Sequence, residues 1–209
     1  MKKKILLGLV AGIGLGCSSS LSGGIDPQSP VKFVNDKYHL NVAEVNQIDP
    51  AYLFVYSWNL YENGKKDDSV FWFYVAQYRA MIIVAMENEN NRLDKDLYKQ
   101  LAEDAGTPLI GNVIFVGNAP KRENLYTYIH SGLGQIINYY AGSNIDNWVA
   151  QAQKVLDFEK EHPFDPFKAV PAEQLDASKF EEGKKLADGL SEFVEYLKTN
   201  KSELEKMRK

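Results

Sequence analysis

The stretch DDSVFWFYVAQYRAMIIVAM, residues 67–86, constrains the fold of this chain more than any other part of the sequence. Either aspartate at its start can cap a helix, and we predict a helix over residues 68–85. Successive residues of a helix are turned by about 100° around its axis, so the apolar side chains of this run point in every direction. A helix that is apolar on all sides is either buried in a protein core or embedded in a membrane.

Two polar residues near the middle of this helix, Gln77 and Arg79, favour the core over the membrane. An arginine at the centre of a bilayer costs about 2.5 kcal/mol or more. In a protein core the same arginine needs a carboxylate or several carbonyl oxygens, because an unpaired buried charge is also costly. The sequence therefore predicts a core helix in which Arg79 is paired.

Start and stop signals place further helices on both sides of this one. Asp49-Pro50 is a capping residue followed by proline at the first helical position, and Gly64 can end the helix that follows. The predicted helices cover residues 50–62, 68–85, 93–105 and 123–141, then a segment that is capped by Ser143 with Asp146 and ends at His162, and finally residues 177–207.

These elements predict an all-α fold, a compact multi-helix domain over residues 31–209. The short apolar run at residues 113–116 lies between glycines and is the candidate for one extended segment. The last helix is mostly charged beyond Lys198, so its end is expected to project from the domain or to fray. Residues 31–45 have a weak, mixed pattern that could form a short strand or an irregular segment.

The helices at residues 50–62 and 68–85 are joined by a short turn and form an αα-hairpin. The pattern resembles one tetratricopeptide unit, because small, aromatic and small residues follow the turn as in that repeat, at Ser69, Phe73 and Ala76. The first helix departs from the repeat, since it has Tyr56-Ser57 where the repeat has Leu-Gly, and no second copy follows at a fixed period. The resemblance implies hairpin packing over about residues 50–85, not a repeat array.

The N-terminus has the layout of a secretory signal, with three lysines, an apolar run of residues 5–15 and a cysteine that follows a glycine. The run is too short to span a membrane, which takes about 20 residues. The segment resembles the lipobox of bacterial lipoproteins, although Gly14 and Leu15 depart from its usual residues. The resemblance implies that residues 1–16 are removed, that Cys17 is lipidated, and that residues 17–30 form a flexible tether.

The same resemblance implies a location in the bacterial cell envelope. In lipoproteins of Gram-negative bacteria a residue other than aspartate after the cysteine usually directs the protein to the outer membrane, and Ser18 stands at that position. We therefore expect a lipid-anchored protein that faces the periplasm and contacts the membrane through the lipid on Cys17.

Charge and cysteine content narrow the range of partners. Without residues 1–16 the chain has 21 basic and 28 acidic residues, and its net charge is −7. An acidic surface argues against nucleic acid, which binds basic faces. Cys17 is the only cysteine, so once it is lipidated no disulfide and no thiol nucleophile remain. The stability of the domain must then come from its core.

The sequence contains no recognisable catalytic or cofactor motif. The three histidines, His39, His130 and His162, are far apart, and none has a second ligand at metal-binding spacing. His130 is followed by Ser131, but the two side chains of a helix point about 100° apart and no nucleophile elbow is present. We therefore expect no cofactor, no metal and no enzymatic activity, and a histidine at the edge of the core.

Aromatic residues are the remaining candidates for a functional surface. Tyrosine and tryptophan are enriched at protein interfaces, although a stripe of them at helical spacing is more often part of a core. The predicted partner or ligand surface consists of Trp72, Tyr78, Arg79, Tyr126, His130 and Tyr139. The sequence thus favours an envelope lipoprotein that binds a protein partner, as an adaptor in envelope assembly or as an immunity protein. The alternative is a helical carrier or sensor of a lipid or aromatic compound bound between residues 68–85 and 123–141.

Overall fold

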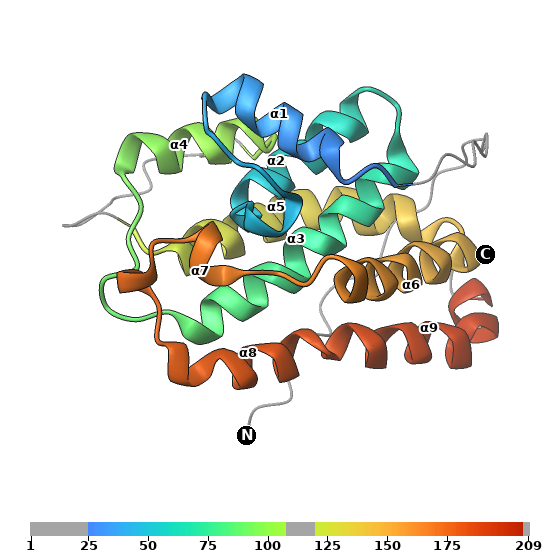
Figure 1. Cartoon of the computed structure of the whole chain (residues 1–209). Helices are drawn as coiled ribbons and strands as arrows, with labels where there is room; N and C mark the ends of the chain where they lie inside the picture. The colour runs from blue at the N-terminus through green and yellow to red at the C-terminus, as the bar shows by residue number, and fades with distance from the viewer. Residues whose placement is uncertain (1–24, 108–119, 207–209) are drawn as a thin grey trace.

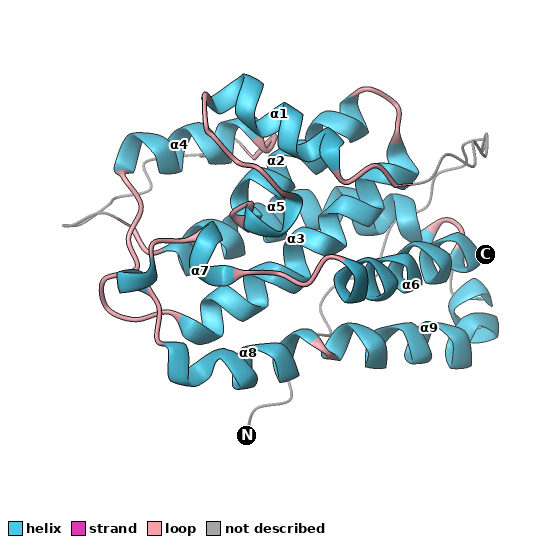
Figure 2. Ribbon diagram, in the orientation of Figure 1, coloured by secondary structure: helices cyan, strands magenta, loops and turns pink. Residues whose placement is uncertain are grey.

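The computed structural model describes residues 25–107 and 120–206, and this part of the chain is all-α, as predicted. Figure 2 shows helices and connecting loops throughout it. The helices are α1 (Gln28–Tyr38), α2 (Pro50–Glu62), α3 (Lys66–Met86), α4 (Lys95–Asp104), α5 (Arg122–Gly142), α6 (Ile145–Glu161), α7 (Pro166–Ala169), α8 (Phe180–Ala187) and α9 (Gly189–Lys206). Three short 3-10 turns, at Val45–Gln47, Ala172–Gln174 and Ala177–Lys179, complete the described elements.

Helix α3 is the centre of the fold, which confirms the core position predicted for it. It runs through the middle of the molecule, with α1 and α2 above it and α8 and α9 below it in Figure 1. It contacts α2, α5, α6 and α8, and 13 of its 21 residues are buried. Within the described ranges, α3 is the one helix whose length and composition would allow it to cross a membrane. Its neighbours explain why it is apolar on every side.

Helices α2 and α3 form the predicted hairpin, and both of its local signals are present in the structure. The Asp49 side chain accepts a hydrogen bond from the backbone N–H of Ala51 at 2.9 Å and so caps α2. Gly64 has φ +78°, the left-handed conformation that ends a helix. Two buried serines join the helices, because Ser57 Oγ donates to the Ser69 carbonyl and Ser69 Oγ donates to the Ser57 carbonyl, each at 2.8 Å.

The buried arginine of α3 finds the carboxylate that the sequence requires. Arg79 is fully buried, and its Nε donates to Glu159 Oε1 of α6 at 2.7 Å. Its two other nitrogens donate to the backbone carbonyls of Val45 at 2.6 Å and His162 at 3.3 Å. The pairing predicted for Arg79 is therefore confirmed. It joins α3 to α6 and to the segments that flank α2 and α7.

The N-terminal part of the domain differs from the expectation. Helix α1 begins at Gln28, inside the range 17–30 assigned to the tether, and ends at Tyr38, so residues 31–38 are helical and not a short strand or an irregular segment. Its residues Pro30, Val31 and Val34 are buried, so α1 belongs to the folded domain. Residues 1–16, Cys17 and the candidate extended segment at 113–116 lie outside the described residues.

The C-terminal helix predicted over residues 177–207 is two helices. Helix α8 ends at Ala187 and α9 begins at Gly189, with Asp188 between them. At Gly183 helix α8 lies so close to α3 that a Cβ there would be 3.1 Å from the backbone of Ile82. The break allows α8 to pack on α3 while α9 packs on α6, which one straight helix could not do.

The described part of α9 does not project, contrary to the prediction. Leu204 is buried near its end, and Lys201 Nζ pairs with Asp146 of α6 at 2.6 Å. The cap of α6 is also not the one predicted, because Asn144, and not Ser143, accepts the hydrogen bond from the backbone N–H of Asn147.

Two glycines with positive φ provide a matched test of packing. A Cβ on Gly106 would lie 2.2 Å from Trp58 Cε2, whereas a Cβ on Gly64 would meet nothing within 4 Å. We expect Gly64→Ala to lower the free energy of unfolding by about 1–2 kcal/mol, the cost of a left-handed alanine. Gly106→Ala should cost clearly more, because Trp58 must also move. Urea denaturation measures both losses, and equal losses would show that Trp58 shifts without cost.

Candidate functional site

Three of the six residues predicted to form a partner or ligand surface are buried, so that prediction is wrong for them. Trp72 and Tyr126 are each 3% exposed and Arg79 is fully buried. Tyr78 and His130 are half-buried, and Tyr139 is 40% exposed. Because α3 has neighbours on every side, aromatic residues along it point into the core. Of the predicted surface, only Tyr139 is well exposed.

The buried aromatic residues have partners for their polar groups inside the core. Tyr126 Oη donates to Asp49 Oδ1 at 2.8 Å. Trp148 Nε1 donates to Tyr74 Oη at 2.8 Å, and Tyr74 Oη donates to Asn138 Oδ1 at 2.9 Å. The high aromatic content therefore reflects a hydrogen-bonded core more than an interface.

Two glycines of α5 are closely approached by side chains of the protein itself. A Cβ on Gly134 would be 3.2 Å from Phe73 Cζ of α3, and a Cβ on Gly132 would be 2.4 Å from Thr107 Cγ2. The contact of Phe73 with Gly134 occupies the place between α3 and α5 where the carrier hypothesis puts its ligand. No structural observation favours that hypothesis.

His130 lies at the edge of the core, as predicted. Its ring stacks on Phe73 with 5.6 Å between the ring centroids. Burial lowers the pKa of His130, which favours the neutral imidazole near neutral pH. Within residues 25–107 and 120–206, no three His, Cys, Asp or Glu side chains are grouped so that they could hold a metal ion.

The outer face of α5 is the surface that differs most from the rest of the described protein. We use this name for its exposed residues beyond Glu123, which recur at helical spacing: Asn124, Thr127, Ser131, Gln135, Ile136 and Tyr139. None of them is charged. Ile136 is 38% exposed and Tyr139 is 40% exposed, so a large aliphatic and a large aromatic side chain lie together on this face.

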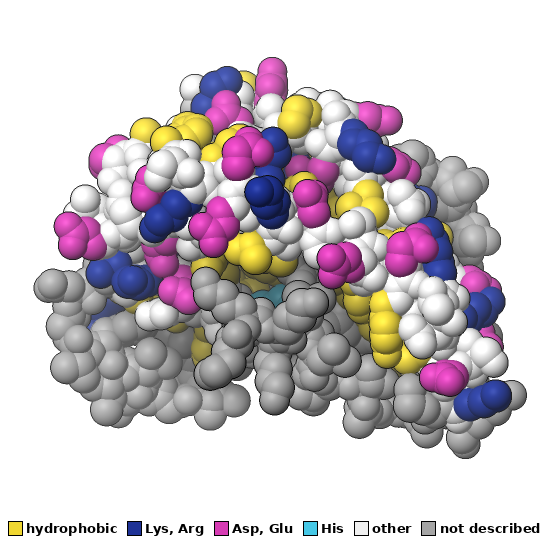
Figure 3. All heavy atoms as spheres, turned by 90° about the horizontal axis from the view of Figure 1, so that it is seen from below, with side chains coloured by type: hydrophobic (Ala, Val, Ile, Leu, Met, Phe, Trp, Pro, Cys, Tyr) yellow, Lys and Arg dark blue, Asp and Glu magenta, His cyan; other side chains and the backbone are white. Residues whose placement is uncertain are grey.

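The signal for this face was present in the sequence, but the sequence analysis missed it. Residues 124–145 contain no lysine, arginine, aspartate or glutamate, although these four types make up 25% of the chain. The exposed faces of α8 and α9 show the ordinary pattern, with charged residues such as Glu181, Lys185, Glu192 and Lys198. Figure 3 views the molecule from below, the side of α8 and α9 in Figure 1, and shows acidic and basic side chains interspersed over its described part.

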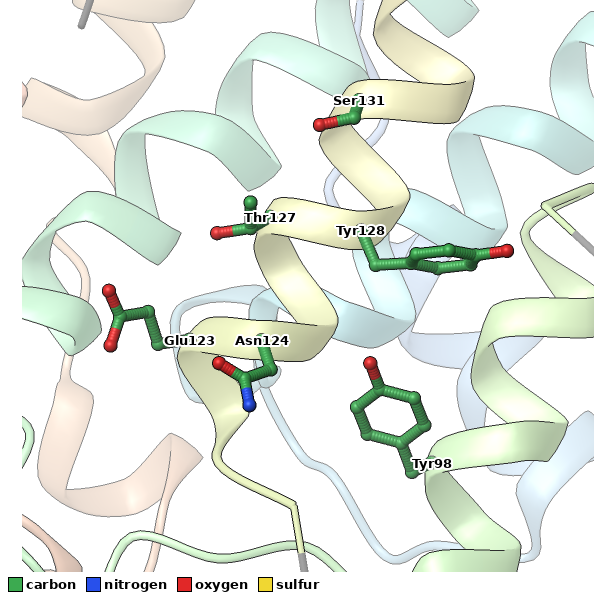
Figure 4. Close-up of a pocket in the computed structure, with 6 residues that line it drawn as sticks. All are labelled: Tyr98, Glu123, Asn124, Thr127, Tyr128 and Ser131. Atoms are coloured by element: carbon green, nitrogen blue, oxygen red, sulfur yellow. The ribbon is translucent and has the colours of Figure 1, made fainter. Parts of the chain in front are cut away.

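A shallow pocket of about 420 Å³ opens where α4 meets the N-terminal half of the α5 outer face. Its lining residues are Tyr98, Glu123, Asn124, Thr127, Tyr128 and Ser131, which combine apolar surface with hydroxyl and amide groups and one carboxylate. In Figure 4, Glu123, Thr127 and Ser131 project to one side of α5, while Tyr128 projects toward α4 and the hydroxyl of Tyr98 points toward α5. The pocket connects the α5 outer face with Tyr98 of α4, with Glu123 at its edge.

The phenol of Tyr98 keeps its proton at neutral pH. Burial raises the pKa of Tyr98, and the neighbouring Tyr128 raises it further. Neutral hydroxyls and amides can donate and accept hydrogen bonds without the cost of removing a charge from water. The hydroxyl and amide groups of this pocket therefore suit contact with another surface.

Comparisons of the chain with known protein families, with curated proteins and with solved protein structures find no match.

Proposed function

We propose that this chain is a lipid-anchored protein of the bacterial cell envelope that binds a protein partner through the α5 outer face and does not catalyse a reaction. The observation that carries the proposal is the absence of charged residues from residues 124–145, which include most of α5 and all of its outer face. A soluble surface helix ordinarily has charged residues on its outer side. The lipobox-like segment ending at Cys17 supports the anchored location.

The composition of this face matches the centre of a protein interface. Interface centres are depleted in charged residues and enriched in tyrosine, whereas their rims are polar. Ile136 and Tyr139 provide the apolar centre, and Gln135 and Ser131 beside them provide hydrogen-bonding groups. A tyrosine can contribute a large contact area together with one hydrogen bond. The partner that fits is a folded envelope protein with a neutral patch of aromatic and aliphatic residues.

Both specific roles suggested by the sequence use such a surface. An adaptor in envelope assembly would hold its partner continuously, and an immunity protein would bind a toxin when it arrives. In either role the lipid keeps the domain at the outer membrane, and recognition takes place on the α5 outer face.

The proposal predicts that a negative charge introduced on the α5 outer face weakens partner binding, whereas a negative charge introduced on α9 does not. Tyr139→Glu should weaken binding by about tenfold or more, because the carboxylate loses water without gaining a partner. Tyr196→Glu is the matched control, since Tyr196 is 44% exposed and lies among charged residues on α9. Both variants should unfold at the wild-type urea concentration.

The partner is identified by a photo-crosslinking amino acid at Gln135, with the same amino acid at Glu195 as the reference. We expect one discrete protein adduct from position 135 that disappears in Tyr139→Glu and persists in Tyr196→Glu. The affinity of that protein for the three chains is then measured with purified components. Equal adducts from both positions would contradict the proposal. A crosslink from position 135 to residues 108–119 of the same chain would also contradict it, because the chain itself would then cover the face.

A further inference from the structure

A second pocket, of about 280 Å³, lies where α2, α4, α5, α7 and the loop after α1 meet. Its residues come from five parts of the chain, and none of them belongs to the α5 outer face. Two of its lining residues, Asp49 and Arg122, are more than nine-tenths buried and are paired, with 2.7 Å between Arg122 Nε and Asp49 Oδ2. The pocket therefore has a buried ion pair in its wall.

Arg122 is held in place by three acceptors, and one of its nitrogens forms no hydrogen bond with the described residues. Its Nε donates to Asp49, and its Nη1 donates to Asn91 Oδ1 at 2.9 Å and to Gln174 Oε1 at 2.5 Å. The hydrogen bonds of Arg122 to described residues come from Nε and Nη1 and none from Nη2, and the residue, which is 7% exposed, lines the pocket. A buried arginine needs acceptors for all its N–H groups, so this end is suited to a ligand that accepts hydrogen bonds.

Asp49 does not compete for that ligand, because its oxygens are already occupied. Its Oδ1 accepts hydrogen bonds from the backbone N–H of Ala51 at 2.9 Å and from Tyr126 Oη at 2.8 Å, and its Oδ2 accepts from Arg122. Burial by itself lowers the pKa of Arg122, but the interactions with Asp49 and Tyr126 raise it above its ordinary value. The guanidinium thus stays charged, and the Asp49 carboxylate accepts hydrogen bonds from Ala51 and Tyr126 as well as from Arg122.

Two further donors face the same space. Tyr52 lines the pocket, and burial together with the charge of Asp49 raises its pKa to about 12, so it keeps its hydroxyl proton. Lys168 also lines the pocket and is exposed. Its Nζ is 3.5 Å from Asp165, a distance typical of a weak surface pair that leaves the ammonium available. Arg122 and Lys168 are the two cationic residues of the lining, and Asp49 is its acidic residue.

The rest of the wall is apolar. Leu93 and Leu101 of the α4 region are buried beneath the pocket, and Leu40 is 37% exposed beside it. A ligand with one negative group and a short apolar body would match these two kinds of wall. A carboxylate carries a single negative charge, accepts a charge-assisted hydrogen bond from a guanidinium N–H, and can be attached to a short apolar body.

We propose that this pocket binds a small organic carboxylate, with the carboxylate on Arg122 Nη2 and the apolar body against Leu93 and Leu101. Such a ligand would contact α2, α4, α5 and α7 and would accept a hydrogen bond from Arg122 Nη2. The site would make the protein responsive to a small molecule independently of any partner on α5.

The test uses 4-fluorobenzoate as the probe and the neutral 4-fluorobenzamide as its isostere, titrated into the full-length chain. Binding is followed by fluorine NMR and by the methyl resonances of leucine, with Leu93 and Leu101 assigned. We expect saturable shifts of these two leucines with the acid, and binding at least about tenfold weaker for the amide, since a charge-assisted hydrogen bond is lost.

Two lysine-to-glutamate variants, one in the pocket and one outside it, test whether the acid binds in this pocket. Lys168→Glu should weaken binding of the acid by about tenfold, whereas Lys154→Glu, on the exposed side of α6, should change it less than about twofold. Both lysines are exposed, so neither substitution threatens the fold. Equal binding of acid and amide, equal effects of the two variants, or no saturable shift at Leu93 and Leu101 would each overturn the proposal.

Discussion

Replacing Arg79 with methionine is expected to lower the free energy of unfolding by about 3–5 kcal/mol, the usual cost of removing one partner of a buried ion pair. Glu159 is 8% exposed, and in this variant its carboxylate would lose the cation 2.7 Å away. The carbonyl oxygens of Val45 and His162 would also lose a donor. Because domains of this size are stable by only about 5–15 kcal/mol, urea denaturation should show the loss clearly.

Two controls separate the ion pair from the general effect of a substitution. The double variant Arg79→Met with Glu159→Leu should recover a large part of the loss, because two apolar side chains replace the uncompensated charge. Lys160→Met breaks the exposed pair with Asp157, where 3.5 Å separates Lys160 Nζ from Asp157 Oδ1, and should cost less than about 1 kcal/mol. A loss in Arg79→Met no larger than that in Lys160→Met would contradict a structural role for the pair.

The pH dependence of the loss provides an independent check with a defined sign. Burial raises the pKa of Glu159 above its ordinary value, although Arg79 opposes the rise. Without Arg79 the folded-state pKa should rise further, so the folded variant binds a proton more readily than the unfolded chain. Stability that depends on this proton is present at low pH and is lost as the pH rises through the folded-state pKa. The difference between wild type and Arg79→Met should therefore be smaller at acidic pH than at pH 8.

Replacing Cys17 with serine is expected to move nearly all of the protein from the membrane fraction to the soluble fraction. The lipobox-like segment implies that residues 1–16 are removed and that acyl chains are attached to the cysteine. Each buried methylene of such a chain contributes about 0.8 kcal/mol to membrane binding, so the loss of all chains should abolish anchoring. Intact mass spectrometry of protein from bacterial membranes should show a processed, acylated chain in the wild type and no acylation in Cys17→Ser.

The residue after the cysteine supplies the matched control. Ser18→Asp should leave the lipid in place but keep the protein in the inner membrane, because aspartate at this position distinguishes the two destinations in the lipoproteins that the segment resembles. Separation of the two membranes by density, followed by intact mass, measures both effects. An unmodified full-length mass in the soluble fraction of the wild type would remove the support for an envelope location.

The elements that followed from local signals were predicted well. Helix α2 covers Pro50–Glu62, the range expected from the proline at its start and the glycine turn after it. Helix α4 is followed by Gly106 with φ +66°, as the stop signal indicated. These signals depend on backbone conformation and capping within a few residues, so they are visible in the sequence alone. The break between α8 and α9 at Asp188 was missed because the apolar residues Ala187, Leu190 and Val194 keep helical spacing across it.

The candidate surface was predicted poorly for a related reason. Trp72 and Tyr126 have the composition of interface residues, but the structure uses them in the core. A single-residue propensity does not distinguish an interface from a core, since both remove aromatic area from water. The proposed surface depends instead on the absence of charge from residues 124–145, because a long helix without charged residues is unusual on a solvent-facing surface.

The sequence by itself determined that the chain forms an all-α domain around one apolar helix and that Arg79 must be paired inside it, because both follow from helical periodicity and the cost of burying a charge. Only the tertiary structure decided which carboxylate pairs with Arg79, and that Arg122 meets Asp49, 73 positions away, in the wall of a pocket. Such contacts depend on how helices distant in sequence pack together. Many packings satisfy the same local pattern, and the close fit of side chains in the core selects one of them.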